Sequence, residues 1–191
     1  NYGDERRTRI VPKVDEIDIE DMIEEEDVII TLTHQGYIKR MPEATYKIQR
    51  RGGKGITVIT TKNEDFVENL FITSTHDSIL FFTNKGKVYL LKAYEIPEGK
   101  RQARGTAIVN LLNMAKSETI SAVIPIEKYN PNINLVFVTK NGYIKKTKLS
   151  NYKNIRRNGI IAINLREDDE LIAVRATGGN DELIVVTSLG M

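Results

Sequence analysis

The chain has 191 residues, of which 40% are hydrophobic and 28% are charged, and it contains neither Cys nor Trp. The lack of Cys excludes a disulfide-stabilised scaffold, thiolate metal sites and a cysteine nucleophile. No apolar run approaches the roughly 20 residues of a membrane-spanning helix, and no secretory leader opens the sequence. We therefore expect a globular cytoplasmic protein that does not associate with membranes.

The net charge of +2 hides a strong asymmetry along the chain. Residues 1–30 carry 11 acidic and 4 basic side chains, net −7, whereas residues 31–191 carry 15 acidic and 24 basic ones, net +9. A basic body therefore follows an acidic leader. We interpret residues 1–27 as a solvated acidic linker; the alternative is a strand or short helix that docks on the body.

The body repeats a turn motif. An apolar run is followed by Thr, two variable residues and Gly at Thr33–Gly36, Thr83–Gly86, Thr139–Gly142 and Thr187–Gly190. A second Gly recurs 17 to 19 residues after the first, at Gly55, Gly105 and Gly159. Gly at the end of a short loop supplies the positive φ that closes a hairpin, so each motif predicts two antiparallel strands.

The segments around these turns predict about four strands per unit. The runs before the turns are short and rich in β-branched and aromatic residues, which is typical of buried strands. The segments expected to pair across the three turns are 28–33 with 37–40, 79–83 with 87–90, and 135–139 with 143–146. Further apolar stretches follow at 56–59 and 69–72, 107–110 and 121–124, and 160–163 and 172–175.

Four strands in about 50 residues is the spacing of a propeller blade. The predicted fold is all-β, a propeller-like array of four-stranded blades, with about three blades and a partial fourth. The predicted units are 28–75, 76–129 and 130–179, and 180–191 is interpreted as the start of the fourth.

Positive charge follows the same repeat. The parts of the units from 36 to 54, 84 to 105 and 140 to 159 carry net charges of +5, +4 and +7, whereas 55–83, 106–139 and 160–191 carry −3, 0 and −4. Because equivalent positions of stacked units share one edge, this pattern predicts a continuous basic rim that binds a polyanion. A merely solvated surface, or an interaction module for acidic protein partners, remains the alternative.

The candidate rim residues are cations that recur in these basic parts. We expect the rim to carry few exposed aromatic residues beyond Tyr46, Tyr94 and Tyr152, and stacking on unpaired bases requires aromatic platforms. Double-stranded DNA, bound through its phosphates, is therefore the favoured ligand. The candidates are Lys39, Arg40, Lys47, Lys85, Lys87, Lys100, Arg101, Arg104, Lys145, Lys146, Lys148, Arg156 and Arg157.

The most specific local feature is the heptapeptide Gln49-Arg50-Arg51-Gly52-Gly53-Lys54-Gly55. Three cations and three glycines allow its backbone to approach phosphates closely. It is no nucleotide-binding P-loop, because the spacing is wrong and no hydroxyl follows the lysine. All seven residues are therefore candidate DNA-binding residues.

This heptapeptide matches all seven positions of the GyrA box, which marks the C-terminal domain of the DNA gyrase A protein. The residues from Asn1 to Thr8 resemble the exit from the catalytic core of that family, and 33–40, 74–77 and 110–112 resemble its first two blades. The sister enzyme topoisomerase IV has a similar fold, but its box is lost or degraded. We therefore favour gyrase, and topoisomerase IV is the alternative.

The resemblance implies a β-pinwheel, a propeller-like ring whose blades exchange strands. DNA would wrap around its basic rim and present a positive crossover, so that the holoenzyme of two GyrA and two GyrB chains introduces negative supercoils with ATP. The catalytic residues and the ATP and Mg²⁺ sites of the family lie outside the part that this chain resembles. We therefore expect no catalytic residue, cofactor or metal here, and we expect His34 and His76 to be turn or surface residues.

Overall fold

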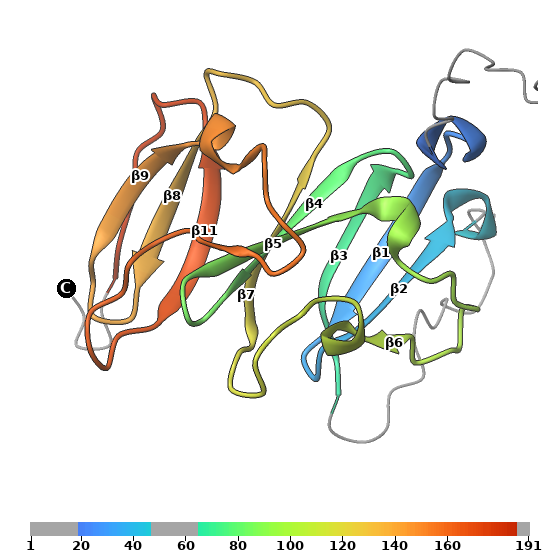
Figure 1. Cartoon of the computed structure of the whole chain (residues 1–191), viewed down its shortest axis with the longest axis horizontal. Coiled ribbons are helices and arrows are strands. Elements are labelled where there is room, and N and C mark those ends of the chain that lie inside the picture. Colours follow the sequence, from blue (N-terminus) through green and yellow to red (C-terminus); the bar gives the residue numbers. More distant parts are fainter. Residues whose placement is uncertain (1–18, 47–64, 187–191) are drawn as a thin grey trace, which may run out of the picture.

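The computed structural model describes residues 19–46 and 65–186, which form three antiparallel β-sheets (Figure 1). The strands are β1 (Asp27–Thr33), β2 (Tyr37–Pro42), β3 (Val67–Ser74), β4 (Ser78–Thr83), β5 (Lys87–Lys92), β6 (Thr106–Ala107), β7 (Ile120–Ile126), β8 (Asn134–Thr139), β9 (Ile144–Lys148), β10 (Ile160–Ile161) and β11 (Leu171–Thr177). Short 3₁₀ turns connect them: η1 (Ile19–Met22), η2 (Glu43–Tyr46), η3 (Ala93–Glu95), η4 (Ile108–Asn110) and η5 (Leu149–Tyr152). The prediction of an all-β fold is confirmed. Within the described ranges, no helix has the length and apolar character needed to cross a bilayer.

Neighbouring units exchange strands. The first sheet has the order β3-β1-β2-β6 and the second the order β10-β5-β4-β7, so each takes its fourth strand from the unit that follows in sequence. Tyr37 pairs with Ala107 in the first exchange, and Val88 pairs with Ile160 in the second. This is the strand exchange that the resemblance implied. The third sheet, β11-β8-β9, contains three strands in the described part of the chain, so the predicted four-stranded blade is not complete there.

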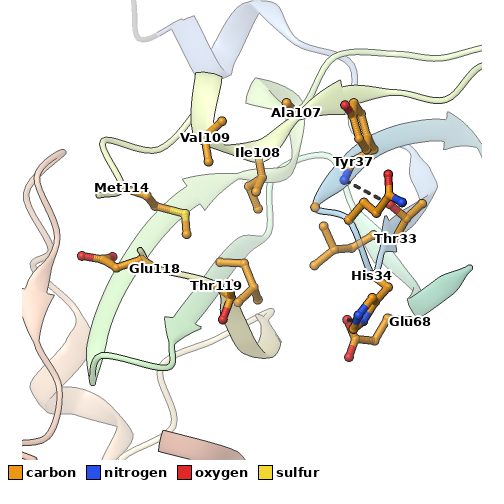
Figure 2. Close-up of a pocket in the computed structure, with 14 residues that line it drawn as sticks. Thr33, His34, Tyr37, Glu68, Ala107, Ile108, Val109, Met114, Glu118 and Thr119 are labelled. Carbon is orange, nitrogen blue, oxygen red and sulfur yellow. Dashed lines mark hydrogen bonds and ion pairs between the residues drawn. The ribbon is translucent and has the colours of Figure 1, made fainter. Parts of the chain in front are cut away.

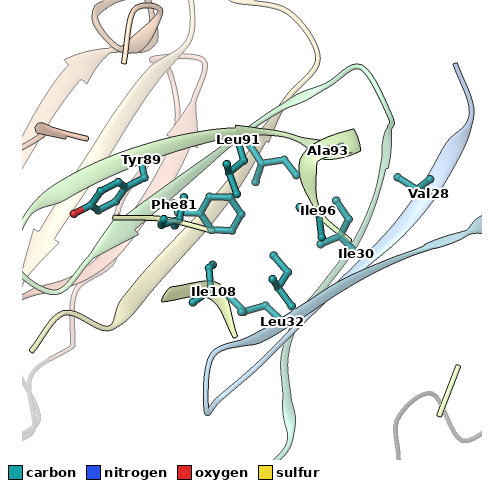
Figure 3. Packing of buried hydrophobic residues seen from close by; sticks show 12 residues of the cluster. Val28, Ile30, Leu32, Phe81, Tyr89, Leu91, Ala93, Ile96 and Ile108 are labelled. Atoms are coloured by element: carbon teal, nitrogen blue, oxygen red, sulfur yellow. The ribbon is translucent and has the colours of Figure 1, made fainter. Parts of the chain in front are cut away.

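Two hydrophobic cores lie between successive sheets, and β4 contributes to both. Every residue of β4 is buried, because its alternate side chains face opposite neighbours. Ile79 and Phe81 pack in the first core, against residues of β1 such as Ile30 (Figure 3). Leu80 and Phe82 pack in the second core. Burial on both faces explains why this strand reads as a continuous apolar run.

The prediction for Tyr152 was wrong. This side chain is 3% exposed and packs edge-on against Phe82 in the second core, with ring centroids 6.1 Å apart. Its hydroxyl donates a hydrogen bond to the Ala162 carbonyl at 3.1 Å. Its aromatic neighbours Phe82 and Phe137 come from other strands, so the basic stretch around Tyr152 suggested a surface position that the packing does not allow.

The described part of the acidic leader, residues 19–27, docks on the body. It contains η1, whose Glu20 carboxylate accepts a hydrogen bond from Lys92 Nζ at 2.8 Å. Further along, the Thr75 hydroxyl donates to the Glu24 carbonyl at 2.8 Å. Residues 19–22 thus form a short 3₁₀ helix that contacts the body, and the interpretation of residues 1–27 as a linker stays a prediction.

Candidate nucleic-acid interface

The three described turn motifs have the same hydrogen bonds. Each Gly donates its N–H to the carbonyl of the Thr that starts the motif, at 2.9, 2.9 and 3.0 Å for the motifs ending in Gly36, Gly86 and Gly142. The Thr hydroxyl accepts the N–H of the residue after Gly, for example from Tyr37 to Thr33 at 3.1 Å. The glycines have φ of 80°, 74° and 82°, which favours Gly. The motif thus starts each basic strand at the same point of each sheet.

The basic residues of the third unit are the most accessible. Lys145, Lys146 and Lys148 on β9 and Arg156 and Arg157 in the loop after η5 are all exposed. None of them forms an ion pair with a carboxylate among the residues that the structure describes. Their charges are therefore available to an external anion.

Two candidate cations of the second unit are paired with carboxylates. Lys85 Nζ lies 3.4 Å from Glu170 Oε1, and Lys87 Nζ lies 3.3 Å from Glu118 Oε1. The Lys85 pair is substantially exposed on both sides, so it contributes little to stability. Both lysines keep about two fifths of their side-chain surface exposed, so they remain accessible to solvent with a reduced net charge.

Lys39 is not a rim residue, which corrects the prediction. Its side chain is 1% exposed, and Nζ donates hydrogen bonds to the carbonyl oxygens of Lys100, Arg101 and Ala103 at 3.1, 2.8 and 3.0 Å. Burial lowers the pKa of the Lys39 ammonium from its ordinary value. The loop of the next unit covers this position, so Lys39 does not reach a phosphate. Arg40 is also largely engaged, since its Nε donates to the Ile96 carbonyl at 2.8 Å.

The loop that covers Lys39 carries candidate cations of its own. Lys100 and Arg104 are exposed, and Arg101 is half-buried. The Arg104 guanidinium lies 3.6 Å above the centre of the Tyr37 ring and donates to Gln35 Oε1 at 2.6 Å. This stacking fixes Arg104 beside the first hairpin turn while leaving it accessible to solvent.

A cavity of about 410 Å³ lies between the first and second sheets, beside the first turn (Figure 2). Ile108, Val109 and Met114 contribute apolar walls, and no lysine or arginine of the described residues lines it. At its edge His34 stacks on Phe66 and is exposed. Candidate cations contact its lining from outside, because Arg104 packs on Tyr37 and Lys87 pairs with Glu118. His34 lies in the turn, as expected.

Comparison with known proteins identifies the fold. The sequence model of one protein family, the DNA gyrase C-terminal domain with its β-propeller fold, matches residues 27–74, 77–127 and 134–177. The chain belongs to this family. The resemblance stated from the sequence is therefore confirmed.

Relatives of the chain are gyrase A proteins. The DNA gyrase A protein of Clostridium acetobutylicum is 58% identical over 190 residues, and that of Halalkalibacterium halodurans is 54% identical over 190 residues. Both alignments cover 100% of this chain and 23% of the relative, so the chain spans about a quarter of the length of these proteins.

Solved structures of related domains have the same fold. The C-terminal domain of DNA topoisomerase IV aligns with a TM-score of 0.71 and 33% identity, covering 83% of this chain and 48% of that one. A DNA gyrase A C-terminal domain aligns with a TM-score of 0.61 and 27% identity, covering 80% of this chain and 48% of that one.

The motif that prompted the gyrase resemblance lies outside the described residues. The box residues Gln49 to Gly55 and the candidate Lys47 fall in the range 47–64. Their role in DNA binding stays a prediction, as does that of the other candidate cations.

One recurring feature of this gyrase domain was not predicted from the sequence: a buried carboxylate two residues before the edge strands β3, β7 and β11. Asp65, Glu118 and Asp169 precede β3, β7 and β11, and each residue is at most 7% exposed. Asp65 Oδ1 accepts the Gln35 N–H at 3.0 Å, and Asp169 Oδ1 accepts the Asn141 N–H at 3.0 Å. The two aspartates thus hold the first and third hairpin turns, and the recurrence of a carboxylate at 65, 118 and 169 was the available signal.

The pKa values of Asp169 and of Tyr89, which lies beside Glu118, are shifted from their ordinary values. Burial by itself would raise the pKa of Asp169, but hydrogen bonds from the Thr139 hydroxyl and from the N–H groups of Asn141 and Glu170 outweigh it and lower the pKa. Burial and the hydrogen bond to Glu118, which lies 3.0 Å from the hydroxyl, raise the pKa of Tyr89 to about 12. Both groups are structural. Among the described residues, no group of acidic and histidine side chains has an arrangement suited to a metal ion.

Proposed function

We propose that this chain binds duplex DNA along the exposed basic side chains of its units and bends it, as the C-terminal part of a DNA gyrase A protein. The accessible cations of the third unit carry this proposal. Five of them lie within 13 residues, on β9 and the loop after η5, and no described carboxylate pairs with them. The family to which the chain belongs supports the same conclusion.

The expected mechanism is electrostatic. Phosphate contacts position DNA without reading its sequence, and each neutralised phosphate releases counterions. Bending a site of 20–30 bp by 40–90° costs on the order of 1–6 kcal/mol, so a wrapped path requires many distributed contacts. We expect about 6–10 phosphate contacts, which corresponds to a loss of affinity of about 10³ to 10⁵ between 50 and 200 mM salt.

The remaining parts of the proposal concern the larger protein. The wrapped DNA would form a positive crossover, and the holoenzyme of two GyrA and two GyrB chains would then introduce negative supercoils with ATP and Mg²⁺. In this scheme the catalytic residues and the nucleotide site lie in other parts of that assembly, and this chain contributes no catalytic group or cofactor. The box from Gln49 to Gly55 would close the DNA path, and the protein would work in the bacterial cytoplasm on the nucleoid.

Salt-dependent binding by matched variants tests the proposal. R156A/R157A removes two exposed cations of the third unit, and K116A/K128A removes two exposed lysines from the neutral part of the second. For a mixed-sequence duplex, the first variant should flatten the slope of log affinity against log salt by about 0.9 for each lost contact, and the control should leave it unchanged. Equal slopes in both variants, or an acidic polypeptide that stays bound in the presence of excess competitor duplex, would refute it.

A topology assay tests the bending. Nicked circular DNA is religated with increasing protein, the protein is removed, and the linking number is measured. A positive shift with the unmodified chain supports wrapping of defined handedness. Binding in gel retardation without any shift would limit the chain to DNA binding and refute the bending.

A further inference from the structure

Lys39 holds a loop of the next unit. All three protons of its ammonium are used on the carbonyl oxygens of Lys100, Arg101 and Ala103, at 2.8 to 3.1 Å. Each of these hydrogen bonds joins residues more than 60 positions apart in sequence. A charged donor makes stronger hydrogen bonds than a neutral one, so a single side chain fixes three carbonyl groups of the loop backbone.

The backbone on both sides of the loop is shaped for this contact. A Cβ on Gly99 would lie 3.0 Å from Lys39 Cδ, and a Cβ on Gly105 would lie 2.5 Å from the Ile38 carbonyl oxygen. Gly105 also has φ of +94°. Two glycines therefore allow residues 99–105 to wrap closely around the lysine stem, and a hydrogen bond from Gly99 N to the Arg40 carbonyl at 3.0 Å anchors the start of the loop.

The other units do not repeat this device. Tyr89 stands at the equivalent position of the second unit, and its hydroxyl contacts one carbonyl, that of Asn113 at 3.2 Å, and the Glu118 carboxylate at 3.0 Å. Lys145 stands there in the third unit and is exposed. We call the Lys39 ammonium and its three carbonyl acceptors the ammonium cage. In the described part of the chain, it is particular to the loop that carries Lys100, Arg101 and Arg104.

The cage determines where the loop's charges lie. With three carbonyls turned toward Lys39, the loop presents Lys100 and Arg104 to solvent. Arg104 is held further by the face of the Tyr37 ring, in the hairpin that leads to Lys39. Ordered cations bind a duplex backbone better than mobile ones, because their ordering cost is met before binding.

We propose that Lys39 is a positioning residue for DNA: it touches no phosphate, but it fixes residues 99–105 so that Lys100 and Arg104 meet the duplex together. This inference rests on the proposed function, because it assigns Lys39 a role within the same DNA-binding surface. It also explains why a lysine of the basic part of the first unit is buried.

The variant K39M tests this role, because it keeps the apolar stem and removes the donors. The control K116M removes one exposed charge of the same kind outside the basic parts. K39Q, which retains two donors, covers the case in which K39M fails to fold. Far-UV circular dichroism establishes that each variant is folded.

Hydrogen exchange without DNA is the first measurement. K39M should speed amide exchange within residues 99–105 and leave β8 and β9 unchanged, K39Q should have a smaller effect, and K116M should have none. Unchanged exchange in the loop of K39M would overturn the inference whatever the result with DNA.

Equilibrium binding to a mixed-sequence duplex is the second measurement. K39M should weaken binding about 3- to 30-fold, as for coupled neighbours, and should weaken it no further in a K100A/R104A background. An equal additional loss in that background would mean that Lys39 contacts DNA itself. An effect of K39M as small as that of K116M would mean that DNA binding by the loop does not require Lys39. Either result overturns the inference while leaving the proposed function intact. Failure of the unmodified chain to bind duplex would instead overturn the proposed function, and the DNA role of Lys39 with it.

Discussion

Alanine substitutions at the turn glycines Gly86 and Gly142 measure how much each unit stabilises the hairpin turn of the preceding unit. Both end the same Thr-x-x-Gly motif and have φ of +74° and +82°. An added Cβ at Gly86 would lie 2.5 Å from the Ile163 carbonyl oxygen, a distance that forces something to shift. At Gly142 the same Cβ has no atom of the described residues within 4 Å.

The expected costs follow from these geometries. Both Gly→Ala changes place a side chain in the left-handed region, at a cost of about 1–2 kcal/mol. G86A must in addition push the Ile163 carbonyl oxygen of the third unit away from the new Cβ, and overpacking of this kind costs about 1–3 kcal/mol. The shift also strains the hydrogen bonds from Ala162 N and Ile163 N to the Gly86 carbonyl, at 2.8 and 3.1 Å. We therefore expect G86A to lower the free energy of unfolding by about 2–5 kcal/mol and G142A by about 1–2 kcal/mol.

Urea unfolding followed by circular dichroism measures this difference, since the chain contains no Trp. Because repeat arrays open locally, hydrogen exchange is measured alongside. Exchange at residues 160–163 should rise in G86A only. Equal losses of stability in the two variants, with unchanged exchange at 160–163, would refute the idea that each unit closes the preceding turn.

Three further predictions concern titration and docking. E118Q should lower the pKa of Tyr89 from about 12 toward its ordinary value of 10.0, which phenolate absorbance measures with Y89F for reference. Because the pKa is raised in the folded state, the stability that Tyr89 contributes is present below pH 10 and is lost as the pH rises through about 12. The pKa of Asp169 is lowered in the fold, so its contribution is present above the ordinary carboxyl pKa and is lost as the pH falls below it. Acid unfolding curves of D169N should accordingly be flatter at low pH, and an unchanged curve would contradict this. E20Q, which removes the 2.8 Å ion pair to Lys92, should weaken the docking of residues 19–23 on the body by about 0.2–1 kcal/mol and speed amide exchange there. The free energy of global unfolding should stay unchanged, and a loss there would contradict this prediction.

Local sequence was sufficient to predict the turns and the long strands, but the stretch expected at 107–110 holds only the end of β6, followed by the 3₁₀ turn η4. The apolar run at 79–83 matches β4 (Ser78–Thr83) to within one residue, and the first three turn motifs have the hydrogen bonds that their Thr and Gly allow. These features depend on side-chain branching and on φ, which a few neighbouring residues determine. The recurrence of the pattern was enough to indicate the propeller family.

Contacts between units decided what the pattern left open. Equivalent segments from Gly36 to Lys39 and from Gly142 to Lys145 have the same sequence, Gly-Tyr-Ile-Lys. Lys39 is 1% exposed inside a ring of carbonyls, whereas Lys145 is exposed on the edge of the third sheet. The difference comes from residues 99–105, about 60 positions along the chain, which cover the first lysine.

The sequence by itself therefore determined the all-β fold, the repeat and the concentration of positive charge in one part of each unit, because each of these depends on residue type and local spacing. Only the tertiary structure decided which cations face solvent, since Lys39 is covered by a neighbouring loop while Lys85 and Lys87 meet Glu170 and Glu118 from other parts of the fold. Burial and ion pairing are properties of residues brought together over long separations, and they set the charge that DNA would meet.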